Sequence, residues 1–162
     1  MATKSNADKV DEVRKEAERL NSEARTADQL MEGVTVLLNE QMLKYNWVGF
    51  YMLEPGADPP MLVLGHYRGA MTPHTRIPLN QGICGAAASS GKTVVVDDVK
   101  KDPRYLACSL ETKSEIVVPV FVSGKVAGEL DIDSHFLAAF ADEDRELIEY
   151  CAQLVGTRLE NA

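Results

Sequence analysis

The sequence has a shortage of basic residues and no long apolar run. Its 162 residues include 17 Lys and Arg against 25 Asp and Glu, giving a formal net charge of −8. This balance argues against a nucleic-acid or anionic-membrane surface, because phosphate groups are bound by clustered Lys and Arg. No apolar stretch approaches the roughly 20 residues of a membrane span, and the first residues lack the apolar segment of a signal peptide. We therefore expect a cytoplasmic protein with no nucleic-acid or membrane partner.

Cysteine is also scarce, and the spacings of common metal motifs are missing. Three cysteines, an odd number, do not make the disulfide framework of a small secreted domain. The sequence contains neither an EF-hand loop nor the His and Cys spacing of a zinc motif, so we expect no metal. The 45% of hydrophobic residues instead suits one globular domain with a substantial core.

Helical periodicity predicts helices at both ends of the chain. Apolar residues recur at helical spacing before residue 25, and Thr26 is a candidate N-cap for a second helix from Ala27 to Lys44. A closing helix begins at Ala141 and Asp142. We assign residues 1–25 to an N-terminal amphipathic helix or extension and residues 26–162 to a single domain.

Segments rich in aromatic and β-branched residues predict strands between these helices. The segments are Trp47–Leu53, Met61–Leu64, Thr93–Val96, Glu115–Val122 and Lys125–Asp133. Ser123 and Gly124 supply the tight turn that joins the last two. This order predicts an α/β domain of the α+β type, with a mainly antiparallel central sheet flanked by N- and C-terminal helices.

Strand alternation places two large rings on one face of the first strand. Trp47, Gly49 and Tyr51 share that face, because successive side chains point to opposite sides of a sheet. Since Gly49 has no side chain, we expect a notch walled by the rings of Trp47 and Tyr51. Plain packing of two large rings is the alternative.

Three carboxylates fall on the later strands. Asp131 and Asp133 share one face of their strand, and Glu115 stands at the start of the preceding strand. Neighbouring carboxylates create a negative field that suits an ammonium group or a metal, although two are too few for a hard-metal site. A solvent-exposed strand end is the alternative.

The three cysteines differ in their surroundings. Cys84 precedes small residues that can begin a helix, and a helix N-terminus stabilises a thiolate. Cys108 follows a loop sequence near Arg104 and Lys113, which makes it the better nucleophile candidate; an inert loop cysteine is the alternative. Cys151 falls on the apolar face of the closing helix, so we expect it in the core.

Taken together, these segments resemble the free methionine-R-sulfoxide reductases, a family built on the GAF fold. The resemblance runs from about Gln29 to Leu159. Its specific motifs are Asn46–Tyr51, Leu62–Gly65, Thr75–Pro78, Gly82–Gly85, Ala107–Cys108, Ser114–Val117 and Leu130–Ser134. Several unrelated short motifs in the same order make a chance match improbable.

The resemblance implies a role for each candidate residue. Cys108 matches the thiol that attacks the sulfoxide sulfur, and Trp47 and Tyr51 match the aromatic wall around the methylsulfinyl group. The carboxylates that hold the amino group of the free amino acid are matched by Glu115, Asp131 and Asp133.

The implied reaction needs no cofactor. A carboxylate can donate a proton to the sulfoxide oxygen only if its pKa is raised, which crowding of three acids achieves. The attacking cysteine becomes a sulfenic acid, and a second thiol condenses with it to form a disulfide. A thioredoxin-type donor is the expected external reductant.

One position departs from the family pattern. His74 stands where the family usually carries its resolving cysteine, just before Thr75. Cys84 can replace that thiol if its sulfur approaches Cys108. The missing cysteine favours the alternative function, a non-catalytic GAF-type sensor of small molecules, whereas Cys108 and the acids favour the enzyme. A homodimer is a further expectation.

Overall fold

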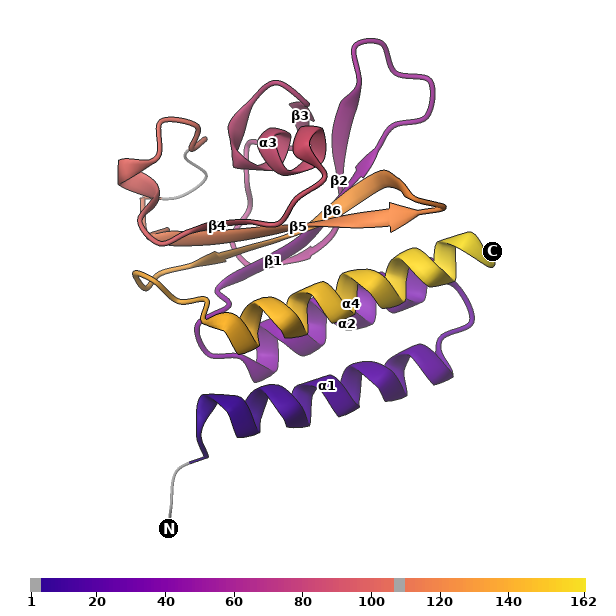
Figure 1. Ribbon diagram of the computed structural model, residues 1–162, viewed down its shortest axis with the longest axis vertical. Helices are drawn as coiled ribbons and strands as arrows, with labels where there is room; N and C mark the ends of the chain where they lie inside the picture. The colour runs from indigo at the N-terminus through magenta and orange to yellow at the C-terminus, as the bar shows by residue number, and fades with distance from the viewer. Residues whose placement is uncertain (1–3, 107–109) are drawn as a thin grey trace.

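One antiparallel sheet with helices on both faces organises the chain (Figure 1). The computed structural model describes residues 4–106 and 110–162. Its elements are α1 (Asn6–Glu23), α2 (Ala27–Gln41), β1 (Trp47–Leu53), β2 (Met61–Arg68), β3 (Arg76–Pro78), α3 (Gly82–Ser90), β4 (Val94–Val96), a short 3-10 helix (Val99–Lys101), β5 (Ser114–Val122), β6 (Lys125–Ser134) and α4 (Asp142–Glu160). The strand order is β3-β2-β1-β6-β5-β4. The predicted α+β fold is confirmed.

The predicted helix starts are close to the observed ones. Thr26 caps α2 through its hydroxyl, which accepts a hydrogen bond from the Gln29 amide at 3.1 Å. The helix ends at Gln41 rather than at Lys44, and Met42 is its C-cap. The sequence analysis missed β3, because three residues are too few to show a periodicity. The division of the chain after residue 25 stays a prediction.

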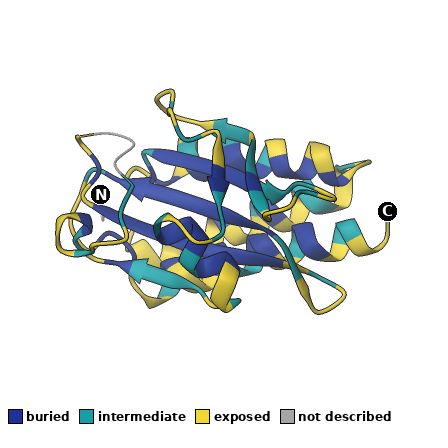
Figure 2. Ribbon diagram, turned by 90° about the horizontal axis from the view of Figure 1, so that it is seen from above, coloured by how far each residue is buried: buried dark blue, intermediate teal, exposed yellow. Residues whose placement is uncertain are grey.

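The helices lie in layers beneath one face of the sheet. In Figure 1, α2 and α4 lie directly below the strands and α1 lies below them, whereas α3 lies on the opposite face. Side chains of the lower face, including Val48, Phe50 and Leu130, pack with apolar residues of α1, α2 and α4. The upper face packs Trp47 and Tyr51 with α3. Figure 2 shows the consequence: the central strands β1, β5 and β6 are mostly buried, whereas the outer strands β2, β3 and β4 are partly exposed.

Register places the candidate residues on this upper face. In the β1–β6 pair, Trp47 faces Asp133 and Gly49 faces Asp131. In the β5–β6 pair, Glu115 faces Asp133. The hairpin between β5 and β6 turns at Ser123 and Gly124, as predicted, and both residues have positive φ. A short turn therefore fixes the register that brings the acids together.

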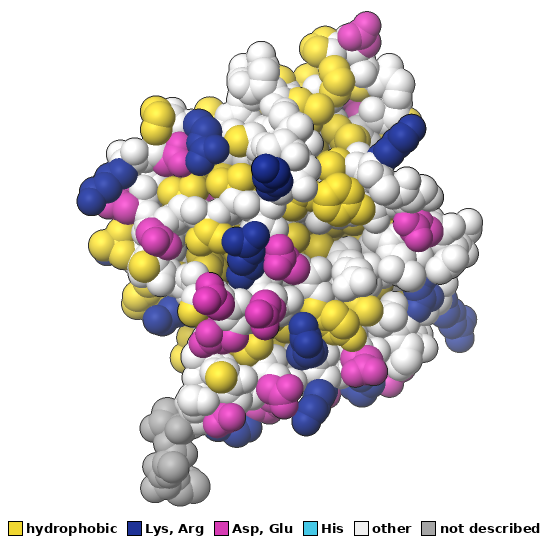
Figure 3. Space-filling model, in the orientation of Figure 1, with side chains coloured by type: hydrophobic (Ala, Val, Ile, Leu, Met, Phe, Trp, Pro, Cys, Tyr) yellow, Lys and Arg dark blue, Asp and Glu magenta, His cyan; other side chains and the backbone are white. Residues whose placement is uncertain are grey.

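Charged side chains of both signs are mixed on the surface. Figure 3 shows Asp, Glu, Lys and Arg interspersed on the face that it draws. Within residues 4–106 and 110–162, none of the helices is both long and apolar enough to cross a bilayer.

Tyr45 and Asp144 make a buried hydrogen bond on the helical side of the sheet. The Tyr45 hydroxyl donates to Asp144 Oδ1 at 2.5 Å, and both side chains are buried. Burial first, and the Asp144 charge next, raise the pKa of Tyr45. A raised pKa in the folded state contributes stability that is complete below the unfolded value of about 10 and is lost as the pH rises above it.

We therefore expect Tyr45→Phe to lower the free energy of unfolding at pH 7 by about 1.5–3 kcal/mol, the range for a hydrogen bond to a charged group. Above about pH 10 the gap between the two proteins should narrow, because only the wild type loses stability through this phenol. Urea unfolding of both proteins at each pH measures the gap. A gap that stays constant between the two pH values would contradict this account.

Candidate active site

Three acidic side chains meet on the upper face of β5 and β6. Glu115 is 5% exposed, and Asp131 and Asp133 are each 3% exposed. They are therefore buried, which rules out a solvent-exposed strand end. One oxygen each of Asp131 and Asp133 is buried without a hydrogen-bond partner among the described residues. Unpaired buried acceptors are costly in a folded protein, so they indicate a place where a donor binds.

Burial raises the pKa of all three acids. It is the largest cause for each of Glu115, Asp131 and Asp133. Repulsion from the two aspartates raises the pKa of Glu115 further. The predicted rise is confirmed, although removal of the carboxyls from water contributes more than their crowding does. Each of these carboxyls therefore loses its proton less readily than a solvent-exposed carboxyl does.

A fourth acid, Glu129, was missed by the sequence analysis. It lies on β6 two residues before Asp131, opposite Tyr51, and is fully buried. Neither of its carboxylate oxygens has a hydrogen-bond partner in the described part of the chain. Burial is the main cause that raises its pKa. The signal was available, because strand alternation places Glu129 on the same face as Asp131 and Asp133.

Cys84 lies in the first turn of α3 and points at these acids. Its Sγ is 3.5 Å from Asp131 Oδ2, to which the thiol donates a hydrogen bond. Burial, and then the nearby Asp131, Glu129 and Glu115, raise the pKa of the Cys84 thiol well above its usual range. The predicted stabilisation as thiolate is wrong. A helix N-terminus stabilises the charge of a thiolate by at most about 2 kcal/mol. Burial among acids destabilises a thiolate by more, because it raises a pKa by several units of about 1.4 kcal/mol each.

The aromatic rings close the site from β1. Trp47 and Tyr51 stack with ring centroids 6.2 Å apart. A Cβ placed on Gly49 would lie 2.4 Å from the Trp47 ring, so the indole covers the glycine. The notch expected at Gly49 is therefore filled by Trp47 itself. Tyr51 is held by a 2.7 Å hydrogen bond from its hydroxyl to the backbone oxygen of His74.

Two small cavities adjoin these residues. A cavity of about 20 Å³ is lined by Tyr51, His74, Ile77, Gly82, Ile83, Cys84, Leu106, Glu115 and Asp131. A neighbouring cavity of about 80 Å³ is lined by Asn46, Trp47, Ala70, Met71, Thr72, Glu111, Thr112, Asp133 and His135. Both are smaller than typical small-molecule pockets of several hundred Å³. Side chains must therefore move when a ligand the size of an amino acid binds.

The other predicted cysteines have different outcomes. Cys108 lies outside the described residues, between Leu106 and Leu110 in the sequence. The predicted cationic neighbour Arg104 is already paired with Asp102, with Nη2 and Oδ2 2.7 Å apart. Cys151 is fully buried on α4, and its predicted place in the core is confirmed.

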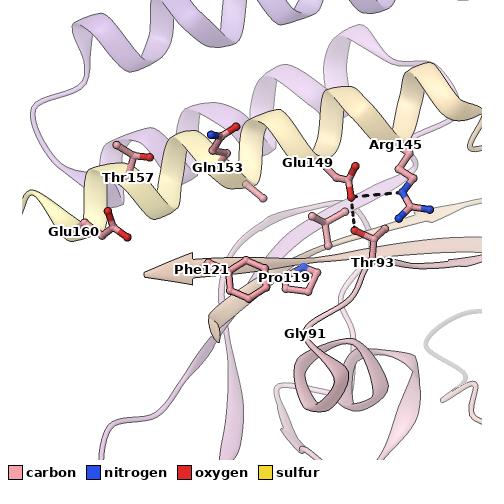
Figure 4. Close-up of a pocket in the computed structure, with 11 residues that line it drawn as sticks. Gly91, Thr93, Pro119, Phe121, Arg145, Glu149, Gln153, Thr157 and Glu160 are labelled. Carbon is pink, nitrogen blue, oxygen red and sulfur yellow. Dashed lines mark hydrogen bonds and ion pairs between the residues drawn. The ribbon is translucent and has the colours of Figure 1, made fainter. Parts of the chain in front are cut away.

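A larger groove lies elsewhere on the molecule, and the side chains that line it are less reactive. It measures about 410 Å³ and lies between α4, the end of β5 and the segment from Gly91 to Thr93 (Figure 4). Glu149 is engaged there, since it accepts a hydrogen bond from the Thr93 hydroxyl at 2.7 Å and lies 3.5 Å from Arg145. Among the described residues that line the groove, none is a cysteine or one of the buried acids. The buried acids beside Cys84 are the better candidate site.

Comparisons with known proteins agree with this geometry. The GAF domain family matches residues 26–159. A free methionine-R-sulfoxide reductase from Escherichia coli (strain K12) is 37% identical over 125 residues, which cover 76% of this chain and 73% of that protein. This chain belongs to the free methionine-R-sulfoxide reductase family. Its GAF fold is the one that the family resemblance predicted.

Solved structures of other reductases have the same fold. A free methionine-R-sulfoxide reductase from Neisseria meningitidis, solved in complex with its substrate, superposes with a TM-score of 0.90 at 34% identity. The match covers 99% of this chain and 93% of that one. A type II reductase of the family from Thermoplasma acidophilum is 41% identical with a TM-score of 0.77, over 83% of this chain and 93% of that one.

Proposed function

We propose that this protein reduces free methionine-(R)-sulfoxide to methionine at the site between α3 and the upper face of the sheet. The main support for this proposal is the cluster of buried acids on β5 and β6 beside Tyr51 and Cys84. Such a cluster has an excess of acceptors, which an ammonium group with its three donors satisfies. The reductase activity belongs to the family of which this chain is a member.

Substrate recognition divides between the two cavities. We assign the substrate ammonium to Glu115, Asp131 and Asp133, because unpaired oxygens of both aspartates are buried there. The methylsulfinyl group lies against Trp47 and Tyr51, whose stacked rings offer an apolar wall. Opening of the two small cavities into one accommodates the amino acid between these groups.

We assign the attack on sulfur to Cys108. Leu106 and Thr112, which flank Cys108 in the sequence, each line one of the two cavities, and this supports the assignment. The Cys108 sulfur attacks the sulfoxide sulfur, and one of the protonated acids supplies a proton to the oxygen. Oxygen passes to the cysteine, which becomes a sulfenic acid, and methionine leaves with its sulfur reduced.

The oxidised cysteine must then be reduced. The Cys84 thiol condenses with the sulfenic acid, so that a disulfide and one water form. A thioredoxin-type dithiol returns the disulfide to two thiols without a bound cofactor. Because the surroundings of Cys84 hold its proton, a nearby carboxylate such as Asp131 must accept that proton during the condensation.

Incubation with free methionine-(R)-sulfoxide and dithiothreitol, followed by quantitation of methionine, tests the proposed function. A small dithiol reduces the sulfenic acid directly, so the assay does not depend on the internal resolving thiol. Stoichiometric production of methionine supports the reductase. Tight binding of the sulfoxide without turnover would favour the sensor instead.

Replacement of His74 by cysteine should accelerate recycling. His74 lines the same cavity as Cys84, so a thiol at this position would restore the resolving group of the family. We expect turnover with thioredoxin to rise about tenfold. Burial and the nearby carboxyls raise the pKa of Cys84, so it resolves the sulfenic acid slowly, whereas a second intramolecular thiol acts at a high effective concentration. Turnover with dithiothreitol should change less.

Steady-state rates with each reductant, and mass spectrometry of the oxidised protein, measure this effect. A His74→Ser protein is the matched control for loss of the imidazole. Efficient thioredoxin-dependent turnover of the wild type, with a Cys84–Cys108 disulfide after one equivalent of substrate, would show that Cys84 suffices and that the prediction is wrong.

We also place the protein in a reducing cytoplasm. Cys84 and Cys151 are free thiols in the structure, as a reducing compartment requires. A homodimer stays a prediction.

A further inference from the structure

We propose that Cys84, Glu115 and Asp131 form a binding site for Zn²⁺, and that the metal competes there with the substrate ammonium. One donor atom from each of these residues lies within 4.8 Å of the other two, and all three residues are buried. They come from α3, β5 and β6, so no spacing in the sequence encodes the set. The competition rests on the proposed function, whereas the metal site itself does not.

The distance between sulfur and oxygen suits tetrahedral zinc. Zinc binds thiolate at about 2.3 Å and carboxylate oxygen at about 2.0 Å, so the edge of a regular tetrahedron between them is about 3.5 Å. Cys84 Sγ and Asp131 Oδ2 are 3.5 Å apart. A zinc ion can therefore replace the thiol proton of Cys84 with little movement of these two side chains. The adjoining cavity of about 20 Å³ also has room for a water-sized species.

Glu129 gives an independent indication of a cationic ligand. It is fully buried, and both its oxygens lack a hydrogen-bond partner among residues 4–106 and 110–162. Its carboxyl is close enough to the Cys84 thiol to affect the pKa of that group. A buried acid without a donor favours a cation nearby. Glu129 is not among the residues whose donor atoms lie within 4.8 Å of one another, so we assign it to the shell around the metal, where its negative charge favours a cation.

The donor set selects the metal. One thiolate with two carboxylates is a mixed soft and hard set, which suits zinc. Mg²⁺ and Ca²⁺ require oxygen ligands throughout and gain nothing from Cys84. Because the Glu115 and Asp131 carboxylates are also assigned to the substrate ammonium, zinc and substrate exclude one another.

Titration with Zn²⁺ under a phosphine reductant tests the site in the full chain. A Cys108→Ser, Cys151→Ala protein retains Cys84 as its single thiol, so any zinc–sulfur bond must come from that residue. We expect one bound zinc per chain and one sulfur at about 2.3 Å in the X-ray absorption spectrum. Absence of zinc binding, or a spectrum with oxygen and nitrogen ligands alone, would overturn the site.

Further variants test each ligand. Adding Cys84→Ser should weaken zinc binding by more than about 100-fold, which exceeds the 10–100-fold loss typical of an outer-shell partner. If the serine protein is unstable, Asp131→Asn should give the same loss of zinc affinity. Glu129→Gln should weaken binding by about tenfold. Zinc affinity unchanged by both ligand substitutions would refute the assignment.

Competition is measured in the Cys151→Ala protein, which retains Cys84 and Cys108. Zinc should raise the KM for free methionine-(R)-sulfoxide without changing kcat, and a chelator should restore the original KM. Zinc binding without inhibition would overturn the shared site. A protein that binds zinc through Cys84 but produces no methionine even without metal would refute the proposed function and leave the metal site standing.

Discussion

Replacement of Cys108 by serine should lower the rate of methionine formation by at least about 1,000-fold, as loss of a nucleophile does in other enzymes. A thiol becomes a good nucleophile when it loses its proton. A serine hydroxyl keeps its proton at neutral pH, and it cannot form a sulfenic acid. The rate is measured with free methionine-(R)-sulfoxide and dithiothreitol. Dithiothreitol makes the result independent of the resolving thiol.

Cys151→Ala is the matched control for this substitution. Cys151 is fully buried on α4, among apolar residues on the opposite face of the sheet from the acids. Its thiol is shielded from substrate, and burial raises its pKa to about 12. The folded variant should therefore retain its rate within about twofold, although removal of a buried side chain lowers its stability. Comparable activity in Cys108→Ser and wild type would eliminate Cys108 as the nucleophile.

The second large effect concerns the substrate amine. N-acetylation of methionine-(R)-sulfoxide should lower kcat/KM by at least about 100-fold, because it replaces an ammonium of three donors with a neutral amide. The acids at the site would then lack their cation, and each unsatisfied buried group costs about 1–3 kcal/mol. Parallel measurement of kcat/KM for both compounds gives the ratio.

Asp133→Asn tests whether Asp133 binds the amino group of the substrate. Asp133 faces both Glu115 and Trp47 across the sheet, and one of its oxygens is buried without a partner in the described residues. An amide of the same shape loses the charge, so the variant should discriminate about tenfold less between the two compounds. Equal rates of the wild type on both substrates would show that the acids do not bind the amino group.

The hydrophobic periodicity of the sequence was sufficient to predict most helices and strands and the faces of the strands, but not which face of the sheet each helix covers. Helical spacing predicted α1 and α4, and alternation in β1, β5 and β6 predicted which side chains share a face. These patterns are local, because a side chain's direction follows from its own backbone and its neighbours. The segment β3 escaped prediction because three residues carry no period.

The sequence was sufficient to select the acids as candidate site residues, but not to predict their environment. Glu115, Asp131 and Asp133 could be selected from the sequence as a pocket set. Their burial depends on α3, which covers the upper face and which no strand pattern describes. Glu129 shows the same limit. Its face was predictable, but nothing local distinguished a buried acid without donors from an exposed one.

Cys84 is the clearest case in which tertiary structure decided the chemistry. The sequence placed this thiol at the start of a helix, where the helix dipole favours a thiolate. Folding brings α3 against β6, so that the thiol donates to Asp131 and is surrounded by carboxyls. Electrostatic effects of this size arise from residues up to 47 positions apart in the sequence. The sequence by itself determined the fold, the family and most of the candidate residues, whereas only the packing of α3 on the sheet raised the pKa of Cys84 and brought this thiol together with the acids.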